Sequence, residues 1–571
     1  MDFSLFFPAE KERAFSKLSD ETLNDLSIDF IADALSDVKF ERDQLRNIMT
    51  NITGDAEVIR YRCDVFDDFL RLPKLREDME QLVLRLKDLM DLERFQKDKE
   101  GSDLWSLINR LREIGTYVSC ITTIKETLES LDIRSEGMRE LLRIVTDISR
   151  ESNFDGLMED VNETLQKAAK LKSITIGVNL DDLLRPKNAA IVSLNDTPFT
   201  NSGLVRRFMD FTKNKSELNS DVESPSSHFH PLSSVTGGTK LGPMYSDPYT
   251  HEVLLDADAL TGGDPLSAAI KKPVSDIMRR TCNEIKSTLK RYVNISGYSL
   301  TSMMPEIIFY IRWAELVDKI TATGMPMKKA EILPTAQREL HFKDIYNLKL
   351  TINKVKGDPI DIITNDIDFD DRYRIFILTG PNRGGKTIFT QAVGLAMLLA
   401  QWGVYVPASA AQISPCDNIF THFPADENDT VDLGRLGEES QRLSAIFEMA
   451  TRNSLLLLNE SLATTSVAEG LFIAMDVVKA MRYLGCYAVF NTHMHELARS
   501  LDELNSVDGD SRVESLVTGV QRGERSFKVA ISPPQGVSYA GDIAKKYGVT
   551  FDQIKTHIEQ RGDLSGAPAE E

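Results

Sequence analysis

Residues 380–387 read GPNRGGKT and fit the pattern GxxxxGK[ST] of loops that hold nucleotide phosphates. Glycines in such a loop let backbone N–H groups turn toward phosphate oxygens. Lys386 offers a positive charge to the β- and γ-phosphates, and Thr387 offers a hydroxyl to Mg²⁺. We therefore expect ATP and Mg²⁺ as cofactors, with the nucleotide held by the whole loop: Gly380, Pro381, Asn382, Arg383, Gly384, Gly385, Lys386 and Thr387.

A second stretch, SLLLLNESLATTS at residues 454–466, has the form of a buried strand with an acidic end. In nucleotide-hydrolysing enzymes, the first acid of such a pair holds the metal shell and the second orients or deprotonates water. Here Glu460 keeps the second position, and Asn459 occupies the first. An amide adds no negative charge, so we expect weaker Mg²⁺ binding and slow hydrolysis. The predicted metal shell is Thr387 with Asn459, and Glu460 is the predicted base.

His493 follows a third apolar run, CYAVFNTH at residues 486–493. A lone histidine is usually structural. This one, however, stands at the carboxyl end of an expected parallel strand, which is where open α/β sheets bind their ligands. We therefore predict that its imidazole reaches the γ-phosphate. The predicted catalytic residues are Lys386, Glu460 and His493.

The elements that must position these residues begin near residue 345, where strand and helix patterns alternate. Apolar runs of this length, bounded by turns, are typical of a mostly parallel sheet covered on both faces. A hairpin is expected within 515–532, turning at 522–524. The expected strands are 374–379, 454–459 and 486–493, and the expected helices are 387–403, 442–452, 466–485, 538–548 and 550–562.

The first 175 residues show apolar side chains at intervals of three and four, which predicts helix after helix. Short strands are expected at 173–182 and 189–196, a long loop at 212–265, and further helices at 267–293 and 299–324. The predicted fold is multidomain: an α-helical core or lever followed by an α/β P-loop ATPase. Its expected divisions are an N-terminal helical segment (1–55), a helical core with a strand-containing insert near 173–265 (56–340), and the ATPase and dimerisation domain (341–571).

The composition of the chain limits the classes of function that it can have. The chain has 571 residues and a formal net charge of −20, so it is not a protein that coats nucleic acid through bulk positive charge. Its five cysteines are widely scattered, which fits reduced thiols and predicts a cytoplasmic protein. The sequence contains no run of about 20 apolar residues, so we expect no membrane span. His228 and His230 lack the companions that a metal site requires.

Several motifs together resemble the MutS family, the ATPases of mismatch repair and their relatives. The similar segments are TGPNRGGKT (379–387), LLLLNESLATTSVAEG (455–470), NTHMHEL (491–497) and GVSYAGDIAKKYGVTFDQI (536–554). The passage from 305 into the ATPase region is also similar, whereas the helical part resembles the family loosely.

This resemblance implies an ATPase domain of the ATP-binding-cassette type and a dimer, here expected to be a homodimer, with two composite ATP sites. The segment facing the partner's ATP would precede the helix at 442–452, with Gly434, Gly437, Glu439 and Ser440. No N-terminal mismatch-reading domain or GxFxE-type motif is visible, so we do not expect this chain to read mismatches.

Three functions stay open at this point. The first is an ATP-driven clamp or switch on duplex or branched DNA, touched by basic residues within 271–291 or 197–215. The second is a dimeric ATP-dependent switch that organises a protein partner and binds no nucleic acid, which the net charge favours. The third is a weakly active relative that keeps ATP as a structural ligand. The family resemblance favours the first.

Overall fold

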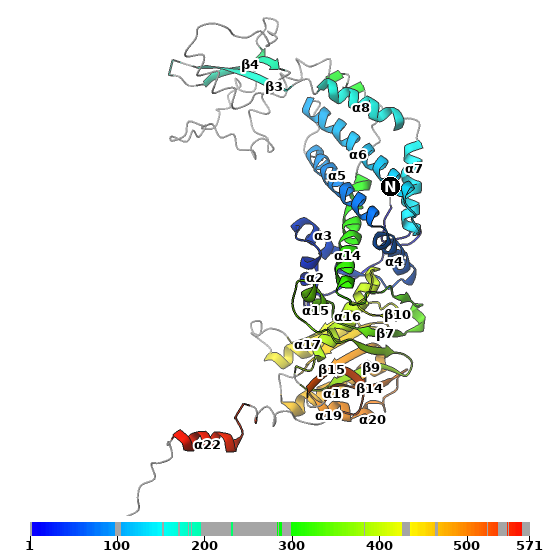
Figure 1. The fold of residues 1–571 in the computed structure, drawn as a ribbon, viewed down its shortest axis with the longest axis vertical. Helices are drawn as coiled ribbons and strands as arrows, with labels where there is room; N and C mark the ends of the chain where they lie inside the picture. The colour runs from blue at the N-terminus through cyan, green and yellow to red at the C-terminus, as the bar shows by residue number, and fades with distance from the viewer. Residues whose placement is uncertain are drawn as a thin grey trace, which may run out of the picture. The chain divides into compact units, whose positions relative to one another are not determined.

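The computed structural model describes residues 3–97, 104–150, 154–168, 172–180, 182–183, 186–195, 230–231, 282–283, 285–287, 298–381, 383–424, 434–462, 466–521, 524–534, 545 and 547–561. The chain forms two compact units. Figure 1 shows the whole fold, coloured from blue at the N-terminus to red at the C-terminus. One comprises residues 1–2, 77–132 and 140–304, and the other comprises residues 3–76, 133–139 and 305–571.

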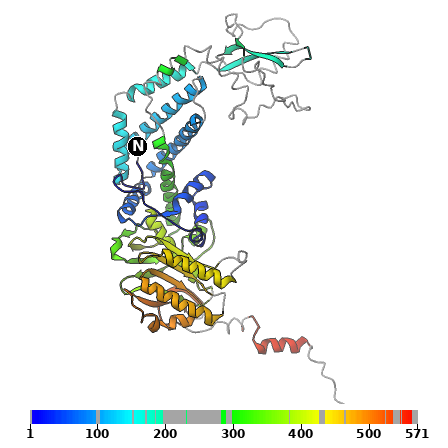
Figure 2. The same cartoon turned by 180° about the vertical axis from the view of Figure 1, so that it is seen from behind.

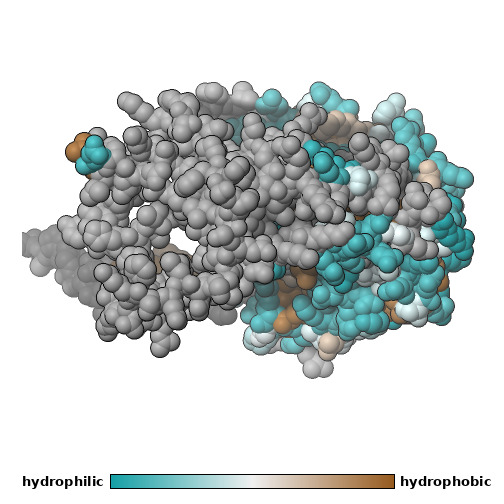
Figure 3. Space-filling model, turned by 90° about the horizontal axis from the view of Figure 1, so that it is seen from above, coloured by the Kyte–Doolittle hydropathy of each residue, from teal (hydrophilic) through white to brown (hydrophobic). Residues whose placement is uncertain are grey.

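The surface of the described residues is mainly hydrophilic on the face that Figure 3 shows, and the hydrophobic residues there are scattered. No helix in the described part of the chain combines the length and apolar character that a membrane crossing requires. No group of three or more residues among the described ones could hold a metal ion through His, Cys, Asp and Glu side chains.

The first unit is built mainly from helices, as the spacing of apolar residues predicts. Gly115 on α6 has no side chain, and Val161 of α8 lies 3.1 Å from the place where its Cβ would stand, so these helices pack closely. An antiparallel sheet adds β3, β4 and β5 in that order. The bounds are α5 (Pro73–Lys97), α6 (Leu104–Ser130), α7 (Glu136–Arg150), α8 (Phe154–Ala168), β3 (Ser173–Leu180), β4 (Pro186–Asn195), β5 (His230–Pro231) and α13 (Tyr298–Thr301).

The expected strands at 173–182 and 189–196 are thus confirmed, with β4 three residues longer at its start. The predicted loop 212–265 lies outside the described residues, apart from β5. The predicted helix 267–293 also lies outside them, apart from five helical residues between 282 and 287. The basic stretch 197–215 therefore lies outside the described residues, as does 271–291 apart from these five residues.

The second unit opens with short elements and one long helix. Asp55 caps α4, because its Oδ1 accepts hydrogen bonds from Glu57 N (2.8 Å) and Val58 N (3.3 Å). A two-stranded antiparallel pairing of β1 with β2 accompanies the predicted helices. The bounds are β1 (Ser16–Lys17), α1 (Asp20–Asp25), α2 (Ile28–Leu35), α3 (Lys39–Met49), β2 (Asn51–Ile52), α4 (Ala56–Arg71) and α14 (Met304–Ala322).

Two sheets follow in the same unit. A four-stranded sheet has the order β6-β10-β7-β8, and a six-stranded sheet has the order β11-β12-β13-β9-β14-β15. The neighbours from β11 to β14 pair in parallel, and β15 returns antiparallel to β14. The bounds are β6 (Glu331–Ile332), η1 (Thr335–Gln337), β7 (Leu340–Ile345), α15 (Leu348–Val355), β8 (Asn365–Phe369), β9 (Tyr373–Thr379), β10 (Ala410–Ile413), β11 (Ile419–His422), β12 (Leu455–Asn459), β13 (Tyr487–Asn491), β14 (Arg512–Gln521) and β15 (Glu524–Ile531).

Helices cover both faces of the six-stranded sheet, as Figures 1 and 2 show from opposite sides. On one face, side chains of α17 (Gly434–Met449), α18 (Val467–Leu484), α19 (His495–Arg499) and α20 (Leu501–Leu504) form a core with the strands. On the other face lies α16 (Lys386–Trp402), where Gly394 lets Leu457 approach. The predicted mostly parallel sheet, its covering helices and the hairpin are confirmed.

Helix α17 corrects one prediction. Gly434, Gly437, Glu439 and Ser440 were expected to precede a helix at 442–452, but they lie within α17. Leu436, seven residues before Leu443, packs against the same core, so the apolar face of the helix extends through this segment. The last helix, α22 (Phe551–Arg561), agrees with the prediction, and the one expected at 538–548 lies mostly outside the described residues.

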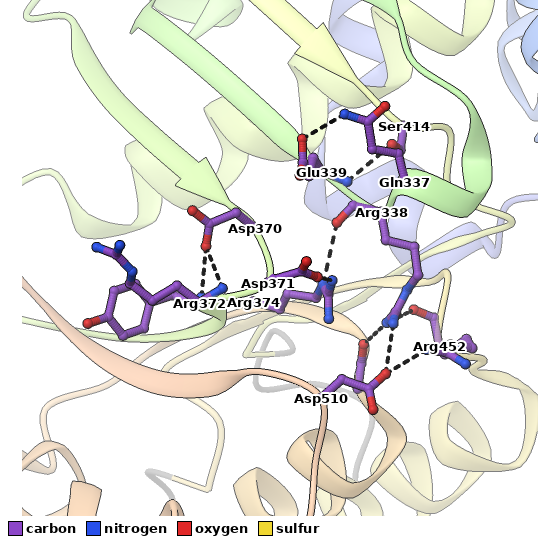
Figure 4. A network of polar contacts seen from close by, with 12 residues as sticks. Gln337, Arg338, Glu339, Asp370, Asp371, Arg372, Arg374, Ser414, Arg452 and Asp510 are labelled. Atoms are coloured by element: carbon purple, nitrogen blue, oxygen red, sulfur yellow. Dashed lines mark hydrogen bonds and ion pairs between the residues drawn. The ribbon is translucent and has the colours of Figure 1, made fainter.

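The amino ends of the parallel strands are joined by a network of charged groups (Figure 4). Arg338 is 7% exposed and donates hydrogen bonds to Asp510 Oδ2 (3.0 Å), Arg452 O (2.9 Å) and Gly485 O. Arg374 Nε in turn donates to Arg338 O at 3.4 Å. Because these residues precede or begin β7, β9, β12, β13 and β14, the network ties the two sheets together.

Candidate functional site

The loop between β9 and α16 has the geometry that its glycines allow. Gly380 has φ 140° and Gly385 has φ 85°, values that side-chain-bearing residues rarely adopt. A Cβ at Gly380 would overlap the Thr518 hydroxyl, and one at Gly384 would lie 2.8 Å from Pro381 O. The loop thus approaches β14 closely. Asn382 lies outside the described residues.

Helix α16 begins directly after this loop. Its N-cap is Gly385, and no side chain caps the first turn. The N–H groups at such a helix end lack partners within the helix and favour a bound anion. Arg383, which has φ 59° and is exposed, lies on the rim of the same region.

A cavity of about 390 Å³ opens beside the loop, a size within the usual range for small-molecule sites. Lys386 and Glu460 both line it, although 74 positions separate them in the sequence. Lys386 is 4% exposed, and its Nζ donates long hydrogen bonds of 3.3 Å to Gly380 O and Pro381 O. Burial lowers the pKa of Lys386, and the charge of Glu460 opposes that change.

Asn459 ends strand β12 and is 6% exposed. Its Oδ1 accepts a hydrogen bond of 2.8 Å from Thr387 Oγ1 and a second one from Asn491 Nδ2. Asn491 stands beside Asn459 in the register of β13. The two predicted metal-shell residues, Thr387 and Asn459, are thus brought together, and Asn491 fixes the orientation of the amide.

Asn491 was not among the predicted site residues. The signal that could have found it is its place at the carboxyl end of the neighbouring strand, because such ends meet at one edge of a parallel sheet.

Glu460 and His493 form an ion-pair contact, with 2.7 Å between Oε1 and Nε2. The hydrogen bond to His493 is the main reason why the pKa of Glu460 is lowered, and partial burial opposes that shift. Both side chains are about one third exposed, at 35% for Glu460 and 40% for His493. His493 therefore meets the predicted base directly, an arrangement that the sequence did not indicate.

The residues predicted to face a partner are found on α17. There the Glu439 carboxylate accepts a hydrogen bond of 2.7 Å from Leu462 N, two residues after Glu460. Glu439 thus contacts a turn of its own chain. The contact of Gly434, Gly437, Glu439 and Ser440 with the nucleotide of a partner stays a prediction.

The cavity also has an apolar wall that the sequence did not reveal. Phe527 on β15 has φ 54°, and its ring lies 3.2 Å from the place where a Cβ of Gly385 would stand. Ile363 and Phe389 line the same cavity. These residues belong to no motif and come from separate elements, so only the fold brings them together.

The residues present fit a nucleotide with a divalent cation. Near the loop, Thr379 Oγ1, Thr518 Oγ1 and Asn491 Oδ1 are buried without a hydrogen-bond partner among the described residues, so polar groups remain for a ligand. The oxygens of Thr387 and Asn459 are of the kind that Mg²⁺ prefers, but they are neutral. Phosphate oxygens would have to supply most of the negative charge around the metal.

Comparisons with known proteins find two family models that match this chain. Residues 376–550 match the family model of MutS domain V, and residues 54–323 match that of the MutS2 N-terminal domain. The two matches together span most of the chain. The chain therefore belongs to the MutS family.

Similar curated proteins include two bacterial DNA mismatch repair proteins MutS. That of Chlorobium chlorochromatii is 34% identical over 206 residues, which cover 36% of this chain and 23% of the relative. That of Prochlorococcus marinus is 40% identical over 136 residues, covering 24% and 15%. The DNA mismatch repair protein spellchecker 1 of Drosophila melanogaster is 32% identical over 218 residues, covering 36% and 23%. The chain thus matches less than a quarter of the length of each of these relatives.

Proposed function

We propose that the carboxyl end of the six-stranded sheet is an ATP site and that residues 341–571 act as a P-loop ATPase domain of the ATP-binding-cassette type. One observation carries the proposal: Lys386, Thr387 and Glu460 meet at one cavity, behind a loop in which a Cβ at Gly380 or Gly384 would clash with neighbouring atoms. The match of residues 376–550 to MutS domain V supports it.

Each residue has a proposed part in this reaction. The loop N–H groups and the start of α16 bind the phosphates, and Lys386 adds a positive charge. When bound, Mg²⁺ would neutralise charge on the β- and γ-phosphates. Glu460, kept ionised by its lowered pKa, accepts a proton from the attacking water. His493 holds the Glu460 carboxylate through their 2.7 Å contact, and its imidazole would also contact the γ-phosphate of the bound nucleotide.

The metal shell accounts for the slow turnover that we propose. Thr387 and Asn459 offer oxygens 2.8 Å apart without a negative charge, so the site binds Mg²⁺ mainly through the nucleotide. The apolar wall formed by Ile363 and Phe527 suits the base and sugar of the nucleotide.

At the level of the whole protein, we propose a homodimer in which ATP drives a clamp or switch on DNA. Similarity to proteins named for DNA mismatch repair supports this function. A switch that organises a protein partner is the second candidate, and the net charge of −20 favours it. The DNA contacts proposed for 197–215 and 271–291 belong to the first candidate alone.

The test is ATP turnover by the wild type and by Lys386→Ala, each alone, with duplex DNA and with branched DNA. A Lys479→Ala variant is the matched control, because Lys479 lies partly exposed on α18 in an ion pair with Glu503. The ATPase proposal expects turnover by the wild type and the control and its loss in Lys386→Ala. The DNA switch further expects the wild-type rate to change with DNA, and an unchanged rate supports the protein-partner switch.

A further inference from the structure

The turn that carries Glu460 has an unusual backbone. Glu460 has φ 51° and Leu462 has φ 63°, so two residues with side chains occupy the left-handed region within three positions. This region is unfavourable for residues other than glycine and persists only where the surroundings hold it. The contacts around the turn therefore determine where the Glu460 carboxylate points.

Four contacts hold the turn, two of them at Ser461. Glu460 N donates to Asn491 O at 2.8 Å, which continues the pairing of the sheet. Leu462 N donates to Glu439 Oε2 at 2.7 Å. Between them, Ser461 lies 2.7 Å from His422 Nδ1 through its hydroxyl, which also donates to His422 O at 3.0 Å.

The pair of His422 and Ser461 has one consistent arrangement of hydrogens. A serine hydroxyl has a single hydrogen, and His422 O accepts it. His422 Nδ1 must then carry a proton and donate it to the same hydroxyl. Both residues are buried, and burial lowers the pKa of His422 to about 4, so the ring is neutral near pH 7. These two hydrogen bonds between His422 and Ser461 connect the end of β11 to the turn.

Glu439 and His422 are also fixed relative to each other. Arg442, one helical turn after Glu439 on α17, donates to Thr421 O (3.0 Å) and Phe423 O (3.2 Å), the residues on either side of His422. It also pairs with Asp25 at 3.0 Å. The first turns of α17 and the end of β11 therefore form one support beneath the turn.

We propose that Glu439 and His422 are positioning residues that hold Glu460 in its place for ATP hydrolysis. The proposal rests on the ATPase function proposed above and adds two residues that act on Glu460 of their own chain through the turn. Glu439 acts through Leu462 N and His422 acts through Ser461. A shift of α17 would withdraw the acceptor from Leu462 N and release the Glu460 carboxylate.

The experiment compares Glu439→Ala, Glu439→Gln, His422→Leu and His422→Asn in the full chain. A glutamine still offers an oxygen to Leu462 N, and an asparagine amide can replace the Nδ1 donor of His422. Glu448→Ala is the matched control, since Glu448 lies exposed on the same helix. The readouts are kcat, the Kd of a fluorescent ATP analogue, and the thermal midpoint of unfolding.

We expect Glu439→Ala and His422→Leu to lower kcat at least tenfold, with the Kd of the analogue within about threefold, because positioning affects the reaction more than binding. Glu439→Gln and His422→Asn should recover most of the loss, and Glu448→Ala should match the wild type. The double variant Glu439→Ala/His422→Leu should lose less than the product of the single losses, because both residues hold one turn.

A kcat within twofold of the wild type for both Glu439→Ala and His422→Leu overturns the proposal, as does equal impairment of Glu439→Gln and Glu439→Ala. A wild type that binds no ATP overturns the proposed function instead. In that case, the crystal structure of Glu439→Ala still tests whether Glu439 holds the turn. If Glu460 and Leu462 keep their φ angles and the Glu460–His493 contact remains, the positioning role of Glu439 is contradicted.

Discussion

The two ends of the six-stranded sheet use charge in opposite ways. At the amino ends, Arg338 donates hydrogen bonds to Asp510 and to two carbonyl oxygens of its own chain. At the carboxyl ends, Lys386 is equally buried, but its Nζ makes two long hydrogen bonds of 3.3 Å within the described residues, both to carbonyls of its own loop. A buried cation whose N–H groups make short hydrogen bonds is structural. One whose hydrogen bonds are long is prepared for an anion.

The neighbouring polar groups divide less sharply, because Arg338 Nε and Arg374 Nη1 at the amino ends are also buried without a hydrogen-bond partner among the described residues. Near the phosphate loop, Thr379 and Thr518 have buried hydroxyls without hydrogen-bond partners in the described ranges. At the other end, Glu339 and Ser414 exchange hydrogen bonds, with Ser414 N donating to Glu339 O (2.8 Å) and Glu339 N donating to Ser414 Oγ (3.1 Å). We infer that substitutions at the carboxyl end change function and that those at the amino end change stability.

The largest expected effect is at the carboxyl end. Glu460→Gln removes the proposed base while keeping its size, so kcat should fall about 10³-fold with the Kd for ATP nearly unchanged. Steady-state turnover and ATP titration measure the two quantities. Glu503→Gln, on the exposed part of α20, is the control and should keep the wild-type kcat. A Glu460→Gln variant with normal turnover would remove Glu460 from the reaction.

At the amino end, Arg338→Ala should lower the free energy of unfolding by about 3 kcal/mol, because it leaves buried carbonyl oxygens without a donor and breaks a partly buried ion pair. Its KM for ATP should stay within twofold of the wild type. Urea unfolding and turnover test this pair of expectations. Arg372→Ala, at an exposed position near the same network, should change stability by less than about 0.5 kcal/mol. If Arg338→Ala abolished ATP binding without loss of stability, the division between the two ends would be wrong.

A smaller effect depends on pH and concerns His422. Its folded-state pKa of about 4 lies below the ordinary value of 6.5, so the unfolded chain takes up a proton first as the pH falls. Stability is therefore full above pH 6.5 and decreases below it, by about 2 kcal/mol at pH 5. Urea midpoints at pH 7.5 and pH 5 should differ less in His422→Asn than in the wild type. Equal differences would show that His422 does not stay neutral in the folded protein.

The smallest predicted change concerns the metal. Asn459→Asp keeps an acceptor for Thr387 and Asn491 and adds a negative charge next to Glu460. The variant should bind Mg²⁺ with ATP about tenfold more tightly and should be less stable without metal, because adjacent carboxylates repel. Turnover at graded Mg²⁺ concentrations measures the first effect. An unchanged Mg²⁺ dependence would remove Asn459 from the metal shell.

Much of the fold could be predicted because buried parallel strands are continuous apolar runs. Residues 374–379, 454–459 and 486–493 gave such runs, and their carboxyl ends located Lys386, Asn459 and Glu460. The start of α17 was missed because Gly434 and Gly437 suggested a loop, although Leu436 continues the apolar face of the helix.

The rest of the site depends on contacts that no local pattern records. His422 is a lone histidine at a strand end, and only the fold brings it to Ser461. Ile363 and Phe527 come from separate elements and meet only at the cavity wall. The contact of Glu439 with Leu462 N likewise joins α17 to the turn after β12, across 23 positions of sequence.

The most direct test of the central claim is a titration of ATP with Mg²⁺ into the full chain and into Lys386→Ala, followed by calorimetry. We predict saturable binding at one site per chain in the wild type and binding at least tenfold weaker in Lys386→Ala, with the unfolding midpoint of the variant unchanged. An absence of binding by the wild type, or equal affinity in the two proteins, would contradict the assignment of this end of the sheet to a nucleotide.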